Sequence, residues 1–239
     1  MIFDKLLLEP EEIIDRIIDS LKKRQHLLLT YFNQHCFNVY WEDEKYRNLL
    51  DNKFDAFQAD LGIFFAFRFF KKQKVQRIDA TAMNQKIINL LIQKNIPIGI
   101  VGGNFESAFI SKKTEEKKLN LVAYFNGFFQ EDQSENIINE LTSVNSPVYI
   151  IGMGVPRQEF FAEKLSNVSN SGIIICVGNF LEFYFGTKKR APVFFQNLGI
   201  EWVFRLGTEP VRLWERYLIG IPLFFYRLLK LKFFPTSFL

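Results

Sequence analysis

The stretch Pro147–Leu165 constrains the fold most strongly, because three different patterns follow one another within it. An apolar run, Val148–Ile151, is followed by the turn Gly152-Met153-Gly154-Val155-Pro156 and then by an amphipathic segment that starts at Arg157. This order predicts a buried strand, a tight turn and a helix, with Pro156 at the first helical position. Glycines let a backbone approach a ligand closely, and a helix N-terminus favours an anion. The stretch is therefore either an anion-binding loop or an ordinary strand-to-helix turn.

The same alternation of short apolar runs and amphipathic segments continues along the chain. It predicts an α/β fold, a Rossmann-like and mostly parallel sheet with helices on both faces. The further strands are expected at Leu27–Tyr31, Phe54–Ala59, Pro97–Val101, Leu119–Tyr124 and Gly172–Val177. Four strands end in polar or glycine-rich turns, at Asp60, Gly102-Gly103-Asn104, Gly152-Met153-Gly154 and Gly178-Asn179. Because parallel strands share their carboxyl edge, these turns are expected to line one composite cleft.

Helices are expected between these strands, and two of their starting points matter for the cleft. Asp79 is predicted to cap the helix that runs to about Asn95. The polar residues Asn33-Gln34-His35 are predicted to end the first strand, with the next helix around Asp43–Leu50. Both features put polar groups where α/β proteins bind ligands.

The chain changes character near residue 190. From Gly186 to Leu239 there are nine basic and three acidic residues, whereas the first 185 residues carry a net charge of −2. We therefore divide the chain into an α/β core, residues 1–190, and a basic helical appendage, residues 191–239, which is expected to meet an anionic partner. Its helices are predicted at Val193–Leu198, Glu201–Leu206, Val211–Ile219 and Pro222–Lys232. Cations among aromatic side chains favour a membrane interface over a helical pair that only docks on the core.

Composition and motifs exclude several classes of protein. Two cysteines and two histidines make neither a disulfide framework nor a multi-histidine metal site. The dinucleotide fingerprint lacks its third glycine, whose place is taken by Arg157, and no acid follows the strand that ends in Cys176-Val177-Gly178. There is no P-loop, metalloprotease helix, nucleophile elbow or paired-aspartate metal motif. No secretory leader or membrane-spanning run is recognised, so we expect a cytoplasmic protein.

Asp60 is the notable carboxylate of the sequence, because it ends an apolar strand between Ala59 and Leu61. Partial burial would raise its pKa and suit it to act as a general base. A helix cap for the following segment is the alternative, and spacing alone favours the cap.

Four motifs stand in order along most of the chain. They are Gly152–Glu159, Arg190-Ala191-Pro192, Leu198–Leu206 and Glu209–Tyr217, accompanied by Gly102-Gly103 and Asn126–Phe129. Together they resemble the motifs of the WecG/TagA/CpsF family of bacterial glycosyltransferases. The resemblance implies an inverting, metal-independent transfer of a sugar from a UDP-sugar to a polyprenyl-diphosphate-linked sugar, in cell-surface polysaccharide biosynthesis. It also implies that the appendage targets the inner face of the cell membrane and completes the active site.

The resemblance implies roles for individual residues as well. Asp60 would be the catalytic base, and Thr30, Asn33 and Gln158 would be polar residues of the catalytic site. The donor would be bound by strand-end glycines, nearby polar groups and appendage arginines, namely Gly102, Gly103, Asn126, Gly152, Gly154, Glu159, Gly178, Arg205, Arg212 and Arg216. Gln158 and Glu159 are expected to face the cleft beside Asp60. Two departures from the family pattern are Leu61 in place of a glycine after Asp60, and a Thr30–Asn33 spacing that is one residue longer.

Several alternatives follow from the same residues. No cofactor other than the donor substrate and no nucleic acid is expected, and a homo-oligomer is left open. The donor sugar would be N-acetylmannosamine, its uronic acid, glucose or glucuronic acid. A non-catalytic assembly protein at the membrane surface is the alternative function. A Rossmann-type oxidoreductase is a third one, which the incomplete dinucleotide fingerprint disfavours.

Overall fold

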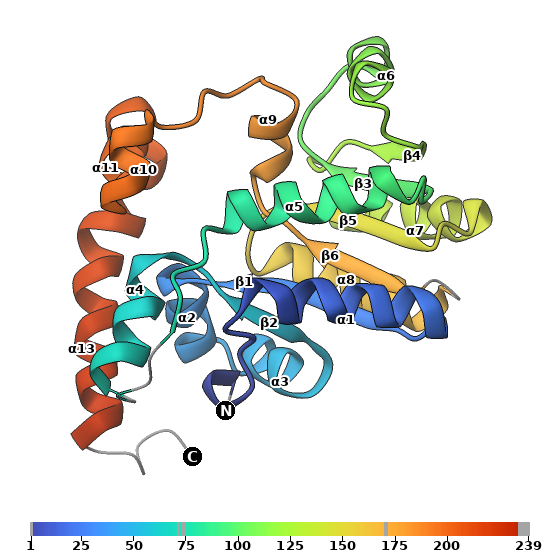
Figure 1. Cartoon of the computed structure of the whole chain (residues 1–239). Coiled ribbons are helices and arrows are strands. Elements are labelled where there is room, and N and C mark those ends of the chain that lie inside the picture. The colour runs from blue at the N-terminus through green and yellow to red at the C-terminus, as the bar shows by residue number, and fades with distance from the viewer. Residues whose placement is uncertain (1, 71, 73–74, 170–171, 234–239) are drawn as a thin grey trace.

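A six-stranded sheet forms the centre of the computed structural model, which describes residues 2–70, 72, 75–169 and 172–233 (Figure 1). The strands are β1 (Leu27–Phe32), β2 (Asp55–Gln58), β3 (Ile98–Gly102), β4 (Leu121–Phe125), β5 (Val148–Gly152) and β6 (Ile173–Cys176). All pairings are parallel, in the order β2-β1-β6-β5-β3-β4. The predicted α/β fold is confirmed, and the predicted strands are present with ends that differ by one or two residues.

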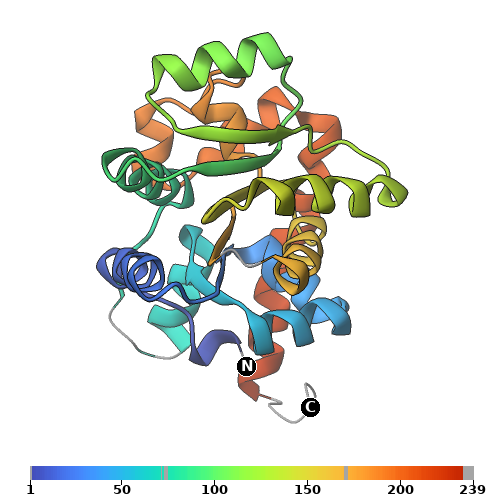
Figure 2. The same cartoon turned by 90° about the vertical axis from the view of Figure 1, so that its right-hand side faces the viewer.

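Helices cover both faces of the sheet. Those of the core are α1 (Pro10–Lys23), α2 (Gln34–Glu42), α3 (Glu44–Lys53), α4 (Asp60–Phe65), α5 (Ala80–Gln93), α6 (Ser107–Glu116), α7 (Ser134–Val144), α8 (Arg157–Val168) and α9 (Phe180–Tyr184). Short 3₁₀ turns at Ile2–Asp4 and Glu131–Gln133 and a π-helical turn at Ala66–Phe70 complete them. Helices α1 and α5 lie on one face of the sheet, and α3, α7 and α8 lie on the other (Figures 1 and 2).

The strands are apolar runs because both of their faces are buried. Tyr149 and Ile151 of β5 belong to a hydrophobic cluster with residues of α3, α7 and α8. Their neighbours Val148 and Ile150 belong to a second cluster with residues of α1 and α5. Successive side chains of a strand point to opposite faces, so this alternation builds one core on each side of the sheet.

The polar run Asn33-Gln34-His35 was predicted to end the first strand, and in the structure it also begins a helix, α2, that was not predicted. The chain turns directly into a helix at Gln34, because the side chain of Asn33 accepts hydrogen bonds from the backbone N–H groups of His35 and Cys36, each at 3.0 Å. An asparagine that caps a helix in this way satisfies two N–H groups that have no partner inside the helix. Phe37 and Tyr40 then pack into the core as the apolar face of the helix.

The appendage stands across the carboxyl edge of the sheet as a column of helices (Figure 1). It contains α10 (Val193–Leu198), α11 (Glu201–Thr208), α12 (Pro210–Trp214) and α13 (Gly220–Phe233). A π-helical turn at Glu215–Ile219 joins α12 to α13, so the two separate helices predicted at Val211–Ile219 and Pro222–Lys232 are one continuous helical run. The N–H of Gly220 reaches the carbonyl of Glu215 there. This wider turn precedes Pro222, which has no N–H to continue the regular ladder.

A polar anchor holds α13 on the core. Arg227 is 7% exposed, and its guanidinium donates to the backbone carbonyl and side-chain oxygen of Asn38, each at 3.1 Å. It also binds the carboxylate of Glu42. Phe224 packs edge-on against Phe37 with ring centroids 5.2 Å apart.

Among the described helices of the chain, none has both the length and the apolar character needed to cross a bilayer.

Gly99 in β3 provides a direct test of the sheet packing. A Cβ atom there would lie 2.5 Å from the ring of Tyr149, whose hydroxyl donates to the carbonyl of Leu141 at 2.7 Å. Gly99→Ala is therefore expected to lower the free energy of unfolding by about 1–3 kcal/mol, measured by urea denaturation. Gly207→Ala is the matched control, because a Cβ atom in that part of α11 meets nothing within 4 Å. Equal unfolding midpoints for the two variants would contradict this packing.

Candidate active site

Two adjoining cavities lie between the carboxyl ends of the strands and the appendage. The larger has a volume of about 580 Å³ and the smaller about 260 Å³. Both are lined by Asn33 at the end of β1, by Ala80 and Thr81 at the start of α5, and by Arg205 and Arg216 of the appendage. Three of the four strand-end turns expected to share a cleft therefore contribute to it, at Asp60, Gly154 and Gly178-Asn179, whereas Gly102-Gly103-Asn104 does not. The appendage forms the opposite wall.

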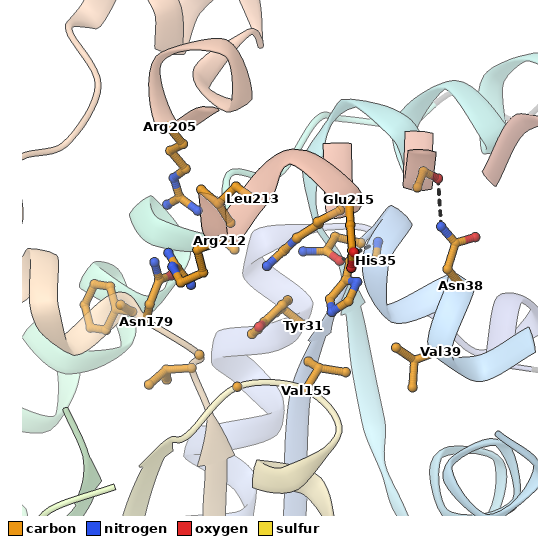
Figure 3. Close-up of a pocket in the computed structure, with 18 of the residues that line it drawn as sticks. Tyr31, His35, Asn38, Val39, Val155, Asn179, Arg205, Arg212, Leu213 and Glu215 are labelled. Atoms are coloured by element: carbon orange, nitrogen blue, oxygen red, sulfur yellow. Dashed lines mark hydrogen bonds between the residues drawn. The ribbon is translucent and has the colours of Figure 1, made fainter. Parts of the chain in front are cut away.

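The larger cavity, here named the polar cavity, is lined by three arginines and by two glutamates, Glu42 and Glu215. Arg205, Arg212 and Arg216 line it together with amide side chains, including that of Asn179 after β6 (Figure 3). The Nε atom of Arg212 donates to Glu209 at 2.6 Å. The guanidinium of Arg205 lies 4.8 Å from the centre of the Phe183 ring. Arginine guanidinium groups bind diphosphates through paired, charge-assisted hydrogen bonds, so this cavity suits an anionic ligand.

Arg216 is the cation at the centre of the site. Its Nε atom is buried and has no hydrogen-bond partner among the described residues. Burial, and secondly the charge of Arg216, lower the pKa of His35 to about 4, so this imidazole is neutral at physiological pH. The positive charge of the larger cavity therefore comes from its arginines and not from the histidine.

Asp60 lines the smaller cavity, here named the aromatic cavity for five of its lining side chains. They are Phe65, Trp202, Tyr217, Phe224 and Phe225. Charged residues line it as well, among them Asp79 and Glu201. The backbone of Asp60 has φ = 74°, in the left-handed region that non-glycine residues seldom adopt. Its Oδ1 atom accepts hydrogen bonds from the N–H groups of Gly62 at 2.8 Å and Ile63 at 3.3 Å. The predicted capping role is thus confirmed. The carboxyl group of this residue, whose backbone conformation is strained, also lines a cavity.

Burial raises the pKa of Asp60 to about 7. The N–H groups of Ile63, Gly62 and Gln34 and the charge of Arg216 oppose this shift, because they stabilise the carboxylate. A carboxyl group with such a pKa populates both protonation states near neutral pH. It can accept a proton from a bound hydroxyl group and later release it.

A second group of predicted site residues lies behind the cavity wall. Thr30, Gln158 and Glu159 are fully buried, and none of them lines either cavity. One oxygen of Glu159 accepts hydrogen bonds from Thr30 and from Gln158, both at 2.8 Å. The amide oxygen of Gln158 in turn accepts the N–H of Gly178 at 2.9 Å. The expectation that Gln158 and Glu159 face the cleft is therefore wrong, because their hydrogen bonds join β1, α8 and the turn after β6.

The glycines predicted to bind the donor, and Asn126 with them, fall into residues that line a cavity and residues that do not. Gly154 and Gly178 line the larger cavity, whereas Gly102, Gly103, Gly152 and Asn126 line neither cavity. A Cβ atom on Gly102 would lie 2.6 Å from the carbonyl oxygen of Gly152, so these glycines let neighbouring strand ends approach each other closely. Asn126 instead binds Asn104 and the N–H of Phe128 in an exposed turn, both at 2.7 Å.

Arg157 and Pro156 also differ from the sequence-based expectation. The guanidinium of Arg157 donates to the carbonyl of Gly127 at 3.0 Å and to that of Phe129, so it holds the turn after β4 instead of standing at the mouth of the cleft. Pro156 lies one position before the first residue of α8. The stretch Pro147–Leu165 therefore contributes Gly154 and Val155 to the cavity and otherwise supports it from behind.

Several lining residues were missed by sequence reasoning. They are Asn38 of α2, Thr81 and Asn84 of α5, and Trp202 and Tyr217 of the appendage. His35 lines the larger cavity as well and was expected among the polar groups at the end of β1. Thr81 and Asn84 could have been found, because they occupy the first turns of the helix that Asp79 was predicted to cap. That cap is confirmed, since Asp79 accepts the N–H of Ala82 at 2.6 Å. Asn38 could be assigned to the site only by recognising that Asn33 caps a helix, because this cap places Asn38 on α2.

The fold and the cleft together define an α/β protein with arginines and polar groups gathered at its strand ends, beside a carboxyl group suited to proton transfer. Within residues 2–70, 72, 75–169 and 172–233, no three His, Cys, Asp or Glu side chains are grouped to hold a metal ion. The model of the glycosyl transferase WecG/TagA/CpsF family matches residues 3–237, nearly the whole chain. The protein therefore belongs to the WecG/TagA/CpsF family of glycosyltransferases. It transfers a sugar from a donor to an acceptor in cell-surface polysaccharide biosynthesis.

Burial of Glu159 generates a testable pH dependence of stability. Burial raises the pKa of this carboxyl to about 7, against the hydrogen bonds from Gln158 and Thr30 that lower it. A carboxyl whose pKa is higher in the folded than in the unfolded state destabilises the protein progressively as pH rises from the ordinary value to the raised one. Relative to Glu159→Gln, which cannot ionise, the wild-type protein is expected to lose about 3 kcal/mol between pH 4.5 and 7.

Urea denaturation of both proteins across this pH range measures the difference. Glu140→Gln, which removes an exposed charge on α7, controls for the loss of charge. Parallel stability curves for wild type and Glu159→Gln would show that Glu159 is ionised in the folded protein and would contradict this assignment.

Proposed function

We propose that this protein is an inverting glycosyltransferase that moves a sugar from a UDP-sugar to a polyprenyl-diphosphate-linked sugar at the inner face of the cell membrane. One observation carries the proposal. Asp60, a carboxyl group suited to proton transfer, lines the aromatic cavity, while Arg205 and Arg216 line both this cavity and the polar one beside it. The proposed base and the arginines proposed to bind the diphosphate thus lie where the two cavities adjoin.

The polar cavity is suited to the donor. Its volume of about 580 Å³ lies in the range of small-molecule sites. The side-chain oxygen of Asn84 is buried without a hydrogen-bond partner among the described residues, and this residue lines the cavity. An unsatisfied buried acceptor is costly unless a ligand supplies a donor, such as a sugar hydroxyl or a uracil N–H. Arg205, Arg212 and Arg216 would neutralise the diphosphate in a reaction that needs no metal.

The aromatic cavity is suited to the acceptor. Asp60 lines this cavity and not the polar one, so the hydroxyl that loses its proton would arrive there. Flat aromatic faces, such as those of Trp202 and Tyr217, provide apolar surface for the ring of an acceptor sugar. Phe225 lines the cavity and is 41% exposed, which gives the cavity an apolar outer rim.

The reaction would proceed by a single displacement. The carboxylate of Asp60 takes the proton of the acceptor hydroxyl, whose oxygen attacks the anomeric carbon of the donor sugar from the side opposite UDP. The bond from that carbon to the diphosphate oxygen breaks, and its electron pair leaves with UDP. Arg205 and Arg216 stabilise the negative charge that develops on the leaving diphosphate, because guanidinium groups held in a partly enclosed site need little reorganisation.

The outer surface of the appendage supports attachment to a membrane. Its exposed apolar side chains are Val193, Phe194, Leu198, Val203, Val211, Trp214, Leu218, Ile219, Phe225, Tyr226, Leu229 and Phe233. Many exposed apolar side chains on one set of helices, with lysines such as Lys230 and Lys232 among them, suit the interface of an anionic bilayer. The polyprenyl acceptor is itself embedded in the bilayer, so attachment would bring the aromatic cavity to its substrate.

The assignment of the base predicts the effect of Asp60→Asn. The amide retains an oxygen that can cap Gly62 and Ile63, so the variant is expected to fold and bind UDP but to lose at least about 100-fold in transfer. In the wild-type enzyme kcat/KM should rise with pH through about 7, because the ionised carboxylate is the active form. UDP release from a panel of UDP-sugars, with a short polyprenyl-diphosphate-sugar acceptor, measures both effects.

Asp132→Asn, at an exposed position, is the matched control for this substitution. Full activity of Asp60→Asn would remove Asp60 as the base. Saturable UDP binding by the wild-type protein, without UDP release from any donor of the panel, would instead favour the non-catalytic assembly protein.

Membrane attachment predicts two separable losses. Truncation after Leu198 is expected to abolish both membrane binding and transfer, because it removes most of the exposed apolar side chains of the appendage and all three arginines. Replacement of Phe194, Val211 and Leu218 by serine should weaken flotation with anionic vesicles and leave UDP binding unchanged, since none of the three lines a cavity. The control replaces Val122, Phe128 and Val168, which are exposed on the core, by serine. Equal flotation of both triple variants would refute attachment through the appendage.

A further inference from the structure

A charged cluster stands where the appendage leaves the core, apart from the arginines of the polar cavity. It consists of Asp79, Arg190 and Glu201. The guanidinium of Arg190 lies 2.7 Å from a carboxylate oxygen of Asp79 and 3.7 Å from one of Glu201. The three side chains are 30% exposed or less. One cation therefore bridges two carboxyl groups in a site that is largely screened from water.

The two carboxyl groups belong to opposite walls of the cleft. Asp79 caps α5, and the first turns of this helix supply Thr81 and Asn84 to the cavities. Glu201 is the first residue of α11, and Arg205 follows it by four positions on the same side of that helix. A bridge between Asp79 and Glu201 thus fixes the distance between the amide wall and the arginine wall.

A neighbouring contact reinforces the same junction. Arg77 donates to the backbone carbonyl of Gln196 in α10 at 3.0 Å. The side chain of Gln196 donates to the carbonyl of Ala191 at 2.6 Å. These two hydrogen bonds are made to backbone carbonyl groups. Arg190 instead neutralises the negative charges of Asp79 and Glu201, so its contribution to the junction is electrostatic.

Asp79 and Glu201 act on each other directly. Burial and the proximity of Asp79 raise the pKa of Glu201, whereas Arg190 and Arg205 lower it. Without Arg190, two carboxyl groups would face each other in a partly buried site with a shared proton or a net repulsion. A net repulsion would push the first turn of α11 away from α5.

We propose that Asp79, Arg190 and Glu201 are positioning residues, which dock α10 and α11 against α5 and thereby hold Arg205 at the donor site. The consequence for activity rests on the proposed function, but the docking itself does not. In the undocked state the donor site lacks Arg205, so the apparent affinity for the donor falls in proportion to the docked fraction. Arg190 acts through the position of Arg205 and is not expected to touch the substrate.

The test compares Arg190→Gln, Glu201→Gln and the double variant. Arg190→Gln is expected to raise the KM for the UDP-sugar on the order of tenfold, with a smaller change in kcat. The double variant should recover most of this loss, because an amide at position 201 removes the like charge opposite Asp79. Glu201→Gln alone should leave the KM for the UDP-sugar and the docking of α11 close to wild type, since the contact between Arg190 and Asp79 persists. Its kcat is not used as a reference, because Glu201 also lines the aromatic cavity.

Hydrogen exchange of the backbone amides of residues 193–208 provides a second readout that needs no substrate. It should accelerate in Arg190→Gln and return toward the wild-type rate in the double variant. Lys53→Gln is the matched control, because it removes the cation of an ion pair between α3 and α8 at 2.7 Å, away from the appendage. It should change neither the exchange of this segment nor the KM.

The outcomes separate this proposal from the proposed function. Wild-type exchange in Arg190→Gln, or a double variant as impaired as the single one, would overturn the docking role. If no donor supports transfer by the wild-type protein, the exchange pattern still tests the docking. If Arg190→Gln alone does not accumulate as folded protein, its recovery as folded protein in the double variant with Glu201→Gln is the rescue expected, and the absence of that recovery would overturn the proposal.

Discussion

Parallel strand pairing with both sheet faces buried is the constraint on which the rest of the molecule depends. Six parallel strands bring all of their carboxyl ends to one edge. Helices α1 and α5 close one face, and α3, α7 and α8 close the other, so that edge is where backbone turns and polar side chains can meet a ligand. The chain then uses its last helices to cover this edge, which turns an open row of strand ends into two adjoining cavities.

Two carboxyl groups show how access to a cavity changes the task of a side chain. Burial raises the pKa of both Asp60 and Glu159 to about 7. Glu159 is fully enclosed, and its hydrogen bonds to Thr30 and Gln158 hold the strand ends in place. Asp60 faces a cavity, so its proton can be exchanged with a bound molecule. Burial thus raises the pKa of both carboxyl groups, but Glu159 supports the structure of the strand ends, whereas Asp60 is available for the proposed proton transfer.

The division of charge between core and appendage has a structural reason. The strand-end turns supply backbone groups and amides, which orient a ligand but do not neutralise it. The cations of the polar cavity, Arg205, Arg212 and Arg216, stand on helices of the appendage. The electrostatics of the site therefore depend on how the appendage docks. The same helices also carry exposed apolar side chains, for which a membrane is the proposed partner.

Much of this architecture could be predicted from local patterns. The strands, the parallel sheet, the cap at Asp79 and the shared carboxyl edge follow from short-range signals, because apolar periodicity and capping residues act within a few positions. The resemblance of the motifs to a known family identified Asp60, Asn33 and the arginines, which the cavities do bring together. Helix α2 was missed because its polar cap, Asn33, could equally have been a loop residue.

The sequence by itself determined the class of fold, the charge of the appendage and the edge of the sheet at which a ligand can bind. Only the tertiary structure decided which of the polar residues near that edge line a cavity. Gln158 and Glu159 stand at the start of α8, where sequence spacing allows either direction, and three hydrogen bonds turn them inward. Whether a side chain lines a cavity or supports it depends on partners far away in sequence, such as Thr30, which is 129 residues from Glu159. Local patterns carry no information about such partners.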